Sequence, residues 1–333
     1  MALKPFFDKT PVRWGFIGCG AVTEVKSGPA YQMTDGFKVA MVMRRDIGKA
    51  KEYAQRHGIP NYTNNAIELI ENHEVDAVYV ATPPDTHKLY ALQVAEVGKP
   101  CCVEKPMAPS YQDSLAIYQA FKEKSIPLFI AHYRRSLPRF NKVKQWLDQG
   151  LVGEVSHLRW HLGKPPNGLD LSGRYNWRTD PKVARGGYFD DLASHGLDLF
   201  SYFFGKVKEA QGFATNQMGL YRAYDAIVGN WVYENGILAE GSWNFGTAHR
   251  KDIVEIYGFK GKITFSVFGE MPLQLTTQET TESVLVKNPK HIQQHHVENI
   301  KKHLMGEALH PSLGEDGLHI SWLMDNILGK IND

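Results

Sequence analysis

VRWGFIGCG, residues 12–20, is a short apolar run that ends in two glycines separated by one residue. The run Val12–Ile17 has the length and composition of a strand buried on both faces. Glycine at positions 18 and 20 suits a tight turn into a helix whose N-terminus approaches a pyrophosphate closely. Thr23 replaces the third glycine of the G-x-G-x-x-G fingerprint, so an ordinary glycine turn is the alternative.

Strand-like and helix-like segments alternate after this turn. Four more apolar runs have the pattern of buried strands: Phe37–Met43, Asp76–Val80, Cys101–Val103 and Leu128–Ala131. Helical spacing lies between them, at Gly48–His57, Thr86–Val97 and Tyr111–Lys124. This alternation predicts a parallel, doubly wound sheet. Because Pro29 cannot continue a helix, we expect a break near Ser27 and a second helical piece starting at Pro29.

The pattern changes at about residue 150, where strands follow one another with Gly-containing turns between them. These strands are expected at Glu154–His161, Val207–Thr215, Ala226–Tyr233, Ile237–Trp243, Asp252–Tyr257, Lys262–Phe268 and Ser283–Val286. Helical patterns are at about 190–204, 291–305 and 315–328. The fold class expected is α/β, with an N-terminal Rossmann doubly wound parallel sheet and a C-terminal α+β domain with a large, mostly antiparallel open sheet. We place the domains at 1–131 and 132–333, with the helices at about 291–328 packing back on the first domain.

Composition excludes several classes of partner. The 333 residues hold 38 Lys and Arg against 36 Asp and Glu, a net charge of +2, so we expect neither nucleic acid nor a membrane as partner. No secretory signal or membrane-spanning run is visible. The odd cysteine count (Cys19, Cys101, Cys102) favours reduced thiols in the cytoplasm. His291, His295, His296 and His303 lack a completing carboxylate or cysteine, so we expect no metal site.

Two arginines follow the second strand. An NAD-specific fold places Asp or Glu here, on the ribose 2′-hydroxyl, whereas arginine accommodates a 2′-phosphate. Arg44 and Arg45 therefore favour NADP over NAD as cofactor. Asp46 could still reach the ribose, and a solvated arginine pair is the other interpretation.

A candidate catalytic lysine and an Asp/His pair complete the pattern. Lys105, between Glu104 and Pro106, follows the fourth strand and thus lies at the edge where ligands bind in open α/β sheets. Asp191 and His195 are four residues apart, so a helix would carry them on one face, where a carboxylate can set the proton affinity of an imidazole. A solvated lysine and a helix-surface pair are the alternatives when each is taken alone.

Together these motifs resemble the Gfo/Idh/MocA oxidoreductases, named for glucose–fructose oxidoreductase, inositol dehydrogenase and a rhizopine-catabolism protein. The resemblance covers nearly the whole chain. It rests on the glycine turn, the loop ATPPDTH (81–87), the EKP motif (104–106), Gly186-Gly187, the Asp191, His195 and Asp198 set, and the closing GEDG (314–317).

The resemblance implies roles for these residues. Lys105 would bind substrate and take part in proton transfer, His195 would be the general acid/base, and Asp191 its partner carboxylate. The nicotinamide would lie between the domains, and the C-terminal sheet would often form a homo-dimer or homo-tetramer interface. Residues expected to contact the dinucleotide are Gly18, Gly20, Ala21, Val22, Arg44, Arg45, Thr82, Pro83, His87, Glu104 and Lys105. Two positions depart from the family pattern, Ala193 mildly and Tyr188 in a way that leaves the substrate class open.

Candidate substrate contacts come from two places. His132 and Tyr133 follow the fifth strand, and Trp177, Arg178 and Tyr188 lie in or after the long loop 163–185, which has little apolar periodicity. That loop is either a binding loop or a surface loop with an aromatic anchor.

The predicted function is hydride transfer between a nicotinamide and a secondary alcohol or ketone of a sugar, cyclitol or related polyol. The alternatives are an NAD-dependent glycoside hydrolase of related fold, a dihydrodiol-type dehydrogenase and a non-catalytic NADP-binding sensor. An intact Lys105, Asp191 and His195 set argues against the sensor.

Overall fold

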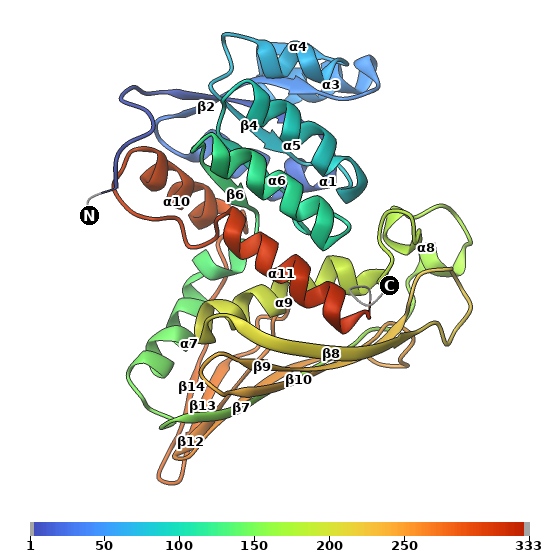
Figure 1. Cartoon of the computed structure of the whole chain (residues 1–333), viewed down its shortest axis with the longest axis vertical. Helices are drawn as coiled ribbons and strands as arrows, with labels where there is room; N and C mark the ends of the chain where they lie inside the picture. The colour runs from blue at the N-terminus through green and yellow to red at the C-terminus, as the bar shows by residue number, and fades with distance from the viewer. Residues whose placement is uncertain (1–2, 330–333) are drawn as a thin grey trace. The chain divides into compact units, whose positions relative to one another are not determined.

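The computed structural model describes residues 3–329 and divides into two compact units (Figure 1). The first unit runs to Ser136 and also includes Pro289–Leu318. The second consists of Leu137–Asn288 and the chain from His319 onward. Each unit therefore combines segments that are far apart in the sequence.

The first unit is built on a six-stranded parallel sheet. Its strands are β1 (Val12–Ile17), β2 (Phe37–Met43), β3 (Asn61–Thr63), β4 (Ala77–Val80), β5 (Cys101–Val103) and β6 (Leu128–Ile130). They lie in the order β3-β2-β1-β4-β5-β6, which is the order of the Rossmann fold. The prediction of a doubly wound parallel sheet is therefore confirmed. The short, polar strand β3 was not predicted.

Helices cover both faces of this sheet. One face packs against α4 (Ala66–Glu71), α5 (His87–Glu96) and α6 (Tyr111–Glu123). The other packs against α2 (Gly28–Met33), α3 (Ile47–His57) and α10 (Gln294–Leu304). The helix after the glycine turn breaks as Pro29 predicts, because α1 (Ala21–Val25) ends before Ser27 and α2 begins at Gly28. Short 3-10 helices, η1 (Pro84–Thr86) and η2 (Tyr133–Ser136), follow β4 and β6.

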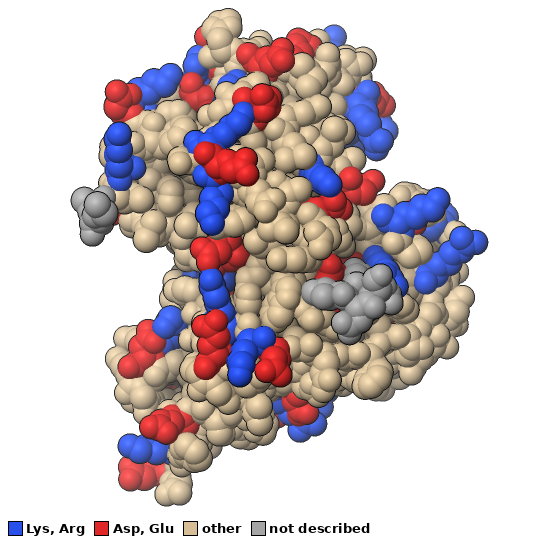
Figure 2. Space-filling view, in the orientation of Figure 1, with Lys and Arg blue, Asp and Glu red and all other residues tan. Residues whose placement is uncertain are grey.

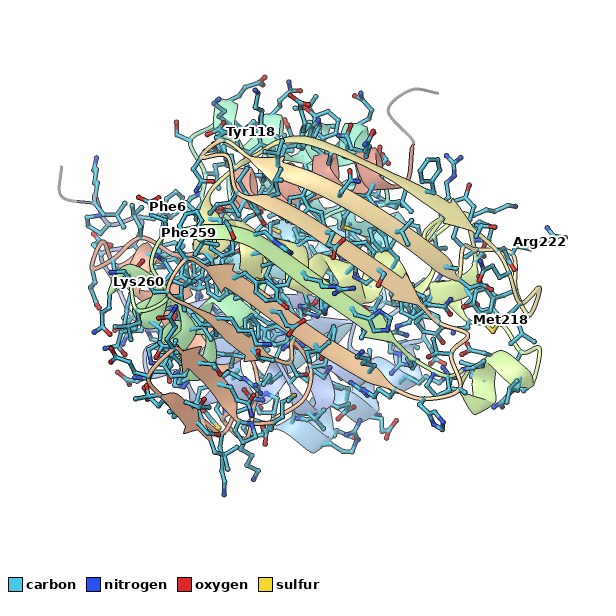
Figure 3. All side chains as sticks on the ribbon, turned by 90° about the horizontal axis from the view of Figure 1, so that it is seen from below. Phe6, Tyr118, Met218, Arg222, Phe259 and Lys260 are labelled. Carbon is cyan, nitrogen blue, oxygen red and sulfur yellow. The ribbon has the colours of Figure 1, made fainter. Side chains whose placement is uncertain are left out.

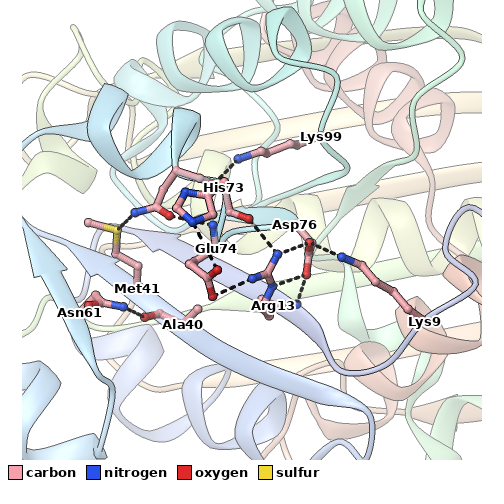
Figure 4. Close-up of polar contacts among 10 residues, drawn as sticks. Lys9, Arg13, Ala40, Met41, Asn61, His73, Glu74, Asp76 and Lys99 are labelled. Carbon is pink, nitrogen blue, oxygen red and sulfur yellow. Dashed lines mark hydrogen bonds and ion pairs between the residues drawn. The ribbon is translucent and has the colours of Figure 1, made fainter.

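A polar network ties the start of β1 to the start of β4 (Figure 4). The Asp76 carboxylate accepts hydrogen bonds from the backbone N–H of Arg13 at 2.8 Å and from its guanidinium at 2.9 Å. Lys9 adds an ion pair at 3.2 Å. Burial alone would raise the pKa of Asp76, but the bonds from Arg13 outweigh it and bring the pKa to about 2.

The second unit contains an eight-stranded sheet. Its strands are β7 (Val155–Gly163), β8 (Val207–Thr215), β9 (Ala226–Tyr233), β10 (Leu238–Asn244), β11 (Lys251–Gly258), β12 (Gly261–Phe265), β13 (Leu273–Thr277) and β14 (Thr281–Val284). The order is β14-β13-β12-β11-β7-β10-β9-β8. Every pair is antiparallel except β7 and β10, which are parallel. The expectation of a large, mostly antiparallel sheet is confirmed, although β13 was not predicted.

Three helices of this unit pack against one face of the sheet: α7 (Pro138–Asp148), α9 (Tyr188–Phe204) and the last part of α11 (Gly314–Ile327). The unit also contains the short helix α8 (Gly168–Leu171) and the 3-10 helix η3 (Trp177–Thr179). Gly196 of α9 lies so close to the sheet that a β-carbon on it would fall 2.4 Å from the Trp160 ring. The helix therefore approaches the sheet at this point because residue 196 has no side chain.

The opposite face of the sheet carries exposed apolar side chains. Figure 3 looks at this sheet, with Phe259 and Lys260 at the turn after β11 and Met218 and Arg222 at the other end, after β8. Phe213, Val228 and Leu238 are 83%, 51% and 61% exposed.

The surface drawn in Figure 2 carries charges of both signs, with Lys and Arg side chains interspersed with Asp and Glu. No helix within residues 3–329 is long and apolar enough to span a bilayer.

Candidate active site

The two glycines after β1 differ in what they require. Gly18 has φ +93°, and a β-carbon on it would fall 2.7 Å from Thr82, so both its conformation and its packing call for glycine. Gly20 caps α1 with an ordinary extended φ of −113°, and a β-carbon there would meet no atom within 4 Å. Nothing in the chain itself requires glycine at position 20. Close approach of a ligand to the backbone would require it.

The end of β2 presents cations toward this turn. The Arg44 guanidinium donates to the carbonyl of Cys19 at 3.0 Å, and Arg45 is exposed. The Asp46 carboxylate instead caps α3 and accepts from the Lys49 N–H at 3.1 Å, which lowers the pKa of Asp46. Asp46 therefore already has a structural use, and no carboxylate stands directly after β2.

Lys105 follows β5 and is held in place by its neighbour. Glu104 is buried, and its carboxylate accepts from the Tyr79 hydroxyl at 2.6 Å, the Gln293 amide at 2.8 Å and the Lys105 N–H at 3.2 Å. These bonds occupy both carboxylate oxygens. Glu104 was predicted to contact the dinucleotide, and this geometry indicates that it positions Lys105.

His87 joins two loops at the same edge of the sheet. Its imidazole nitrogens lie 2.8 Å from the carbonyl of Thr82 and 3.0 Å from that of Pro106. The ring is fully buried, which lowers its pKa. Thr82, next to Pro83, also accepts from the Thr86 hydroxyl at 2.7 Å. His87 thus fixes the loop that carries Thr82 and Pro83. His132 and Tyr133, the weaker substrate candidates, are both buried.

The predicted Asp/His pair lies at the start of α9 in the second unit. Asp191 and His195 are one turn apart on this helix, and His195 is 5% exposed. The His195 ring packs edge-on against Phe268 at 5.8 Å between centroids. The Asp191 carboxylate accepts from Nε of Arg178 at 2.7 Å. Arg178 was predicted to contact substrate, and the structure pairs it with Asp191, the predicted partner of His195.

A cavity of about 320 Å³ opens beside Asp191. Its lining residues come from the carboxyl end of β7, the following loop, the start of α9, the segment before β11 and the segment after β12. They are Leu162, Lys164, Asn167, Leu169, Asn176, Arg178, Tyr188, Asp191, Leu192, Arg250 and Phe268. This volume is in the range of small-molecule sites. His195 is not among the lining residues, but its ring contacts Phe268, which is one of them.

Tyr188 lines this cavity, and its hydroxyl is fully engaged in hydrogen bonds. The hydroxyl donates to Asp170 at 2.6 Å and accepts from the side-chain amides of Asn167 at 2.7 Å and Asn176 at 3.0 Å. Burial, assisted by the bond to Asp170, raises the pKa of Tyr188 to about 12. The departure from the family pattern at position 188 therefore fastens the loop 163–185 to α9.

Within each unit the structure brings several predicted residues together. The first unit holds the glycine turn, the Thr82 loop and Lys105, whereas the second holds Asp191, His195, Arg178 and Tyr188. Trp177 lies outside the cavity lining, and its ring stacks on the Arg178 guanidinium at 4.3 Å. Sequence reasoning missed Lys164 and Arg250. The pairing of β7 with β11 brings these two residues together, and no local sequence pattern signals it, because the two strands are not consecutive.

Two family models match the chain. Residues 12–132 match an oxidoreductase family described as an NAD-binding Rossmann fold, and residues 140–264 match the GFO/IDH/MocA C-terminal domain. Oxidoreductase P35 of Formosa agariphila is 35% identical over 319 residues, which are 96% of this chain and 98% of that protein. The chain belongs to the Gfo/Idh/MocA family of oxidoreductases. The resemblance inferred from its motifs is thereby confirmed.

The similarity to other members of the Gfo/Idh/MocA family also extends over most of the chain. The 1,5-anhydro-D-fructose reductase of Ensifer adhaerens is 25% identical over 313 residues, covering 92% of each chain. A solved structure of levoglucosan dehydrogenase in complex with NADH matches with a TM-score of 0.86 at 21% identity, covering 96% of this chain and 97% of that one.

Membership implies a bound nicotinamide dinucleotide, and the residues present fit one. Gly20 leaves its backbone open to a ligand, and the first turn of α1 has N–H groups without intrahelical acceptors. Ala21 and Val22 supply that turn. Within residues 3–329, no group of three or more His, Cys, Asp and Glu side chains is arranged to hold a metal ion.

Proposed function

We propose that this Gfo/Idh/MocA oxidoreductase transfers a hydride between a nicotinamide dinucleotide and a secondary alcohol or ketone of a sugar, cyclitol or related polyol. The observation that supports it best is the placing of Asp191 and His195 one turn apart on α9, beside a cavity of ligand size. The bound dinucleotide supplies the hydride acceptor.

The chain's own residues provide the acid–base chemistry. In the oxidative direction His195 accepts the proton of the substrate hydroxyl. The negative charge of Asp191, four residues away and held by Arg178, favours the imidazolium that results. The family resemblance implies that Lys105 hydrogen-bonds the substrate as negative charge develops on it. Glu104 holds the backbone of Lys105 in place through the bond to its N–H.

Steady-state rates of dinucleotide reduction over a panel of secondary-alcohol sugars and cyclitols test this proposal. Lys105→Met and His195→Asn are expected to lower kcat about 10²- to 10⁴-fold, because each removes a group that handles the proton. Lys124→Met and His249→Asn change exposed residues and serve as matched controls. Unchanged rates in both site variants would contradict the proposal. Release of free sugar from an aryl glycoside without net reduction would identify the glycoside hydrolase.

We propose further that NADP(H) is the preferred dinucleotide. The relatives do not support this preference, since the levoglucosan dehydrogenase structure holds NADH. Two observations on this chain support it. Arg44 and Arg45 stand where an NAD-specific fold has a carboxylate, and Asp46 is engaged in capping α3.

We also propose that the protein is a cytoplasmic homo-oligomer that associates through the outer face of the eight-stranded sheet. Phe213 pairs with Val228 across β8 and β9, and both are exposed on that face. Contiguous exposed apolar side chains of this kind are typical of protein interfaces. The described cysteines, Cys19, Cys101 and Cys102, are free and buried, which suits a reducing compartment.

A further inference from the structure

Three cationic side chains from three separate segments line the cavity of the second unit. Lys164 follows β7, Arg178 belongs to η3, and Arg250 precedes β11. Strand pairing explains two of them. Gly163, the last residue of β7, is paired with Lys251, the first of β11, so Lys164 and Arg250 leave the same end of adjacent antiparallel strands. The register of the sheet therefore builds a basic wall.

This basic wall, formed by Lys164, Arg178 and Arg250, is only partly neutralised. Arg178 is paired with Asp191 at 2.7 Å. Within the part of the chain that the structure describes, neither Lys164 nor Arg250 forms an ion pair. Arg250 is exposed and Lys164 is half-buried. A half-buried lysine without an ion pair is unusual, because burial of an unpaired charge costs free energy.

The ammonium of Lys164 is held in a defined position. Its Nζ lies 4.2 Å from the centroid of the Tyr188 ring, a cation–π contact. The three hydrogen bonds on the Tyr188 hydroxyl prevent that ring from turning away. Burial lowers the pKa of Lys164, and nearby Arg250 and Arg178 add to this, whereas Asp170 and Asp191 oppose it. An anion in the cavity would relieve both the desolvation and the repulsion.

The balance of charge indicates that the ligand is an anion. Among the residues that line the cavity, Lys164, Arg178 and Arg250 are cationic, whereas Asp191 is the one carboxylate. An anionic ligand would offset the excess positive charge, whereas a neutral sugar would leave it uncompensated.

We infer that the substrate is a sugar acid, and that Lys164 and Arg250 bind its carboxylate while Asp191 and His195 face its reacting carbinol. The inference rests on the proposed function, which it deepens by naming the substrate class. A sulfate ester on a sugar carries the same single charge and the same oxyanion chemistry, so the experiment compares the two. Charge-assisted bonds to an oxyanion are the strong kind, which suits recognition by these cations.

Binding and turnover of three matched monosaccharides test the inference, with the dinucleotide at saturation. They are a hexuronate, its parent hexose, which has a hydroxymethyl group in place of the carboxylate, and a sulfate ester of that hexose. Calorimetry measures affinity and dinucleotide reduction measures kcat/KM. The hexuronate is expected to bind at least about tenfold more tightly than the hexose. Tighter binding of the sulfate ester than of the hexuronate would overturn the carboxylate assignment.

Lys164→Met and Arg250→Gln separate the basic wall from the rest of the site. Each is expected to weaken hexuronate binding about 10- to 100-fold, to weaken hexose binding much less, and to leave affinity for the dinucleotide unchanged. Lys251→Met removes an exposed neighbouring cation and is the control. Equal loss for acid and neutral sugar, or no loss in either variant, would overturn the inference.

The two readouts distinguish the inference from the function on which it rests. If the hexuronate binds and loses affinity in Lys164→Met but is not oxidised, the inference stands and the proposed hydride transfer fails. If sugars are oxidised with no advantage for the acid, the hydride transfer stands and the inference fails. If the hexuronate does not bind, the inference fails whatever the rates are.

Discussion

At the scale of single residues, Gly18 and Gly20 belong to one motif, but the fold requires glycine only at position 18. Gly18 is required by the chain, because it has a positive φ and lies against Thr82. Gly20 has neither constraint. A substitution at position 20 can therefore test ligand binding without disturbing the fold, whereas a substitution at position 18 cannot.

Gly20→Ala is expected to leave the free energy of unfolding within about 0.5 kcal/mol of wild type, since the new methyl group meets nothing. Dinucleotide affinity should fall at least about tenfold, because the β-carbon obstructs close approach to the backbone. Calorimetric titration with NADPH and with NADH measures both the loss and the cofactor preference. Unchanged affinity would contradict the placing of the dinucleotide at this turn, and tighter NADH binding would contradict the role given to Arg44 and Arg45.

The residues of the candidate site that belong to local sequence patterns were predictable. The contacts that depend on tertiary packing were not. Gly18, Lys105, Asp191 and His195 belong to local patterns that follow a strand or repeat along a helix. The bond from Arg178 to Asp191 joins a loop to a helix, and no spacing in the sequence encodes it. Such contacts depend on tertiary packing.

At the scale of elements, helix α9 is the part that carries the Asp/His pair, and its distance from the sheet is set by Gly196. A β-carbon there would clash with the Trp160 ring, which is buried and also packs on Phe200 and Trp243. The ring has little freedom to move away. Substitution should therefore displace the helix and, with it, the residues of its first turn.

Gly196→Ala is expected to lower the free energy of unfolding by about 1–3 kcal/mol through overpacking, despite the better helix propensity of alanine. Gly168→Ala is the matched control, because a β-carbon at position 168 meets no atom within 4 Å. Urea unfolding monitored by tryptophan fluorescence measures both variants. Equal stabilities for the two would contradict the close packing of α9 on the sheet.

The Arg13–Asp76 network fastens β1 to β4, and its contribution should depend on pH. The pKa of Asp76 is about 2 in the folded protein, against an ordinary value of 3.8. The stabilisation is therefore present above pH 4 and is lost as the pH falls from about 4 to about 2. Asp76→Asn should cost about 2 kcal/mol at neutral pH and progressively less below pH 4.

Unfolding free energies of wild type and Asp76→Asn across this pH range measure the effect. Asp8→Asn, which changes an exposed aspartate, is the control. A difference between wild type and Asp76→Asn that stays constant from neutral pH down to pH 2 would show that the carboxylate charge is not what holds β1 to β4.

At the scale of the whole molecule, sequence reasoning identified the two sheets and their classes. Continuous apolar runs marked β1, β2 and β5 with their observed bounds, and successive strand-like segments with Gly-containing turns marked β8 and β9. Strand β3 was missed because its three residues, two of them exposed, are too few to form a pattern. The parallel pairing of β7 with β10 was not predictable, since it joins strands that are not consecutive in sequence.

The exposed face of the eight-stranded sheet leads to a prediction about assembly. Light scattering should give the wild type a mass that is a multiple of the 37.6 kDa chain. Phe213→Asp should reduce it to that of the single chain, because it places a charge in the proposed interface. Leu309→Asp, which changes another exposed apolar residue, should not. A wild type that is monomeric at all concentrations would contradict association through this face.

Transfer of deuterium is the measurement that tests the central claim most directly. A hexuronate deuterated at each secondary carbinol carbon is incubated with the protein and oxidised dinucleotide, and the dinucleotide is analysed by mass spectrometry. Our account predicts one deuterium in the reduced dinucleotide, at a rate that falls about 10²-fold or more in His195→Asn. Formation of product with no deuterium in the dinucleotide would contradict hydride transfer between substrate and cofactor.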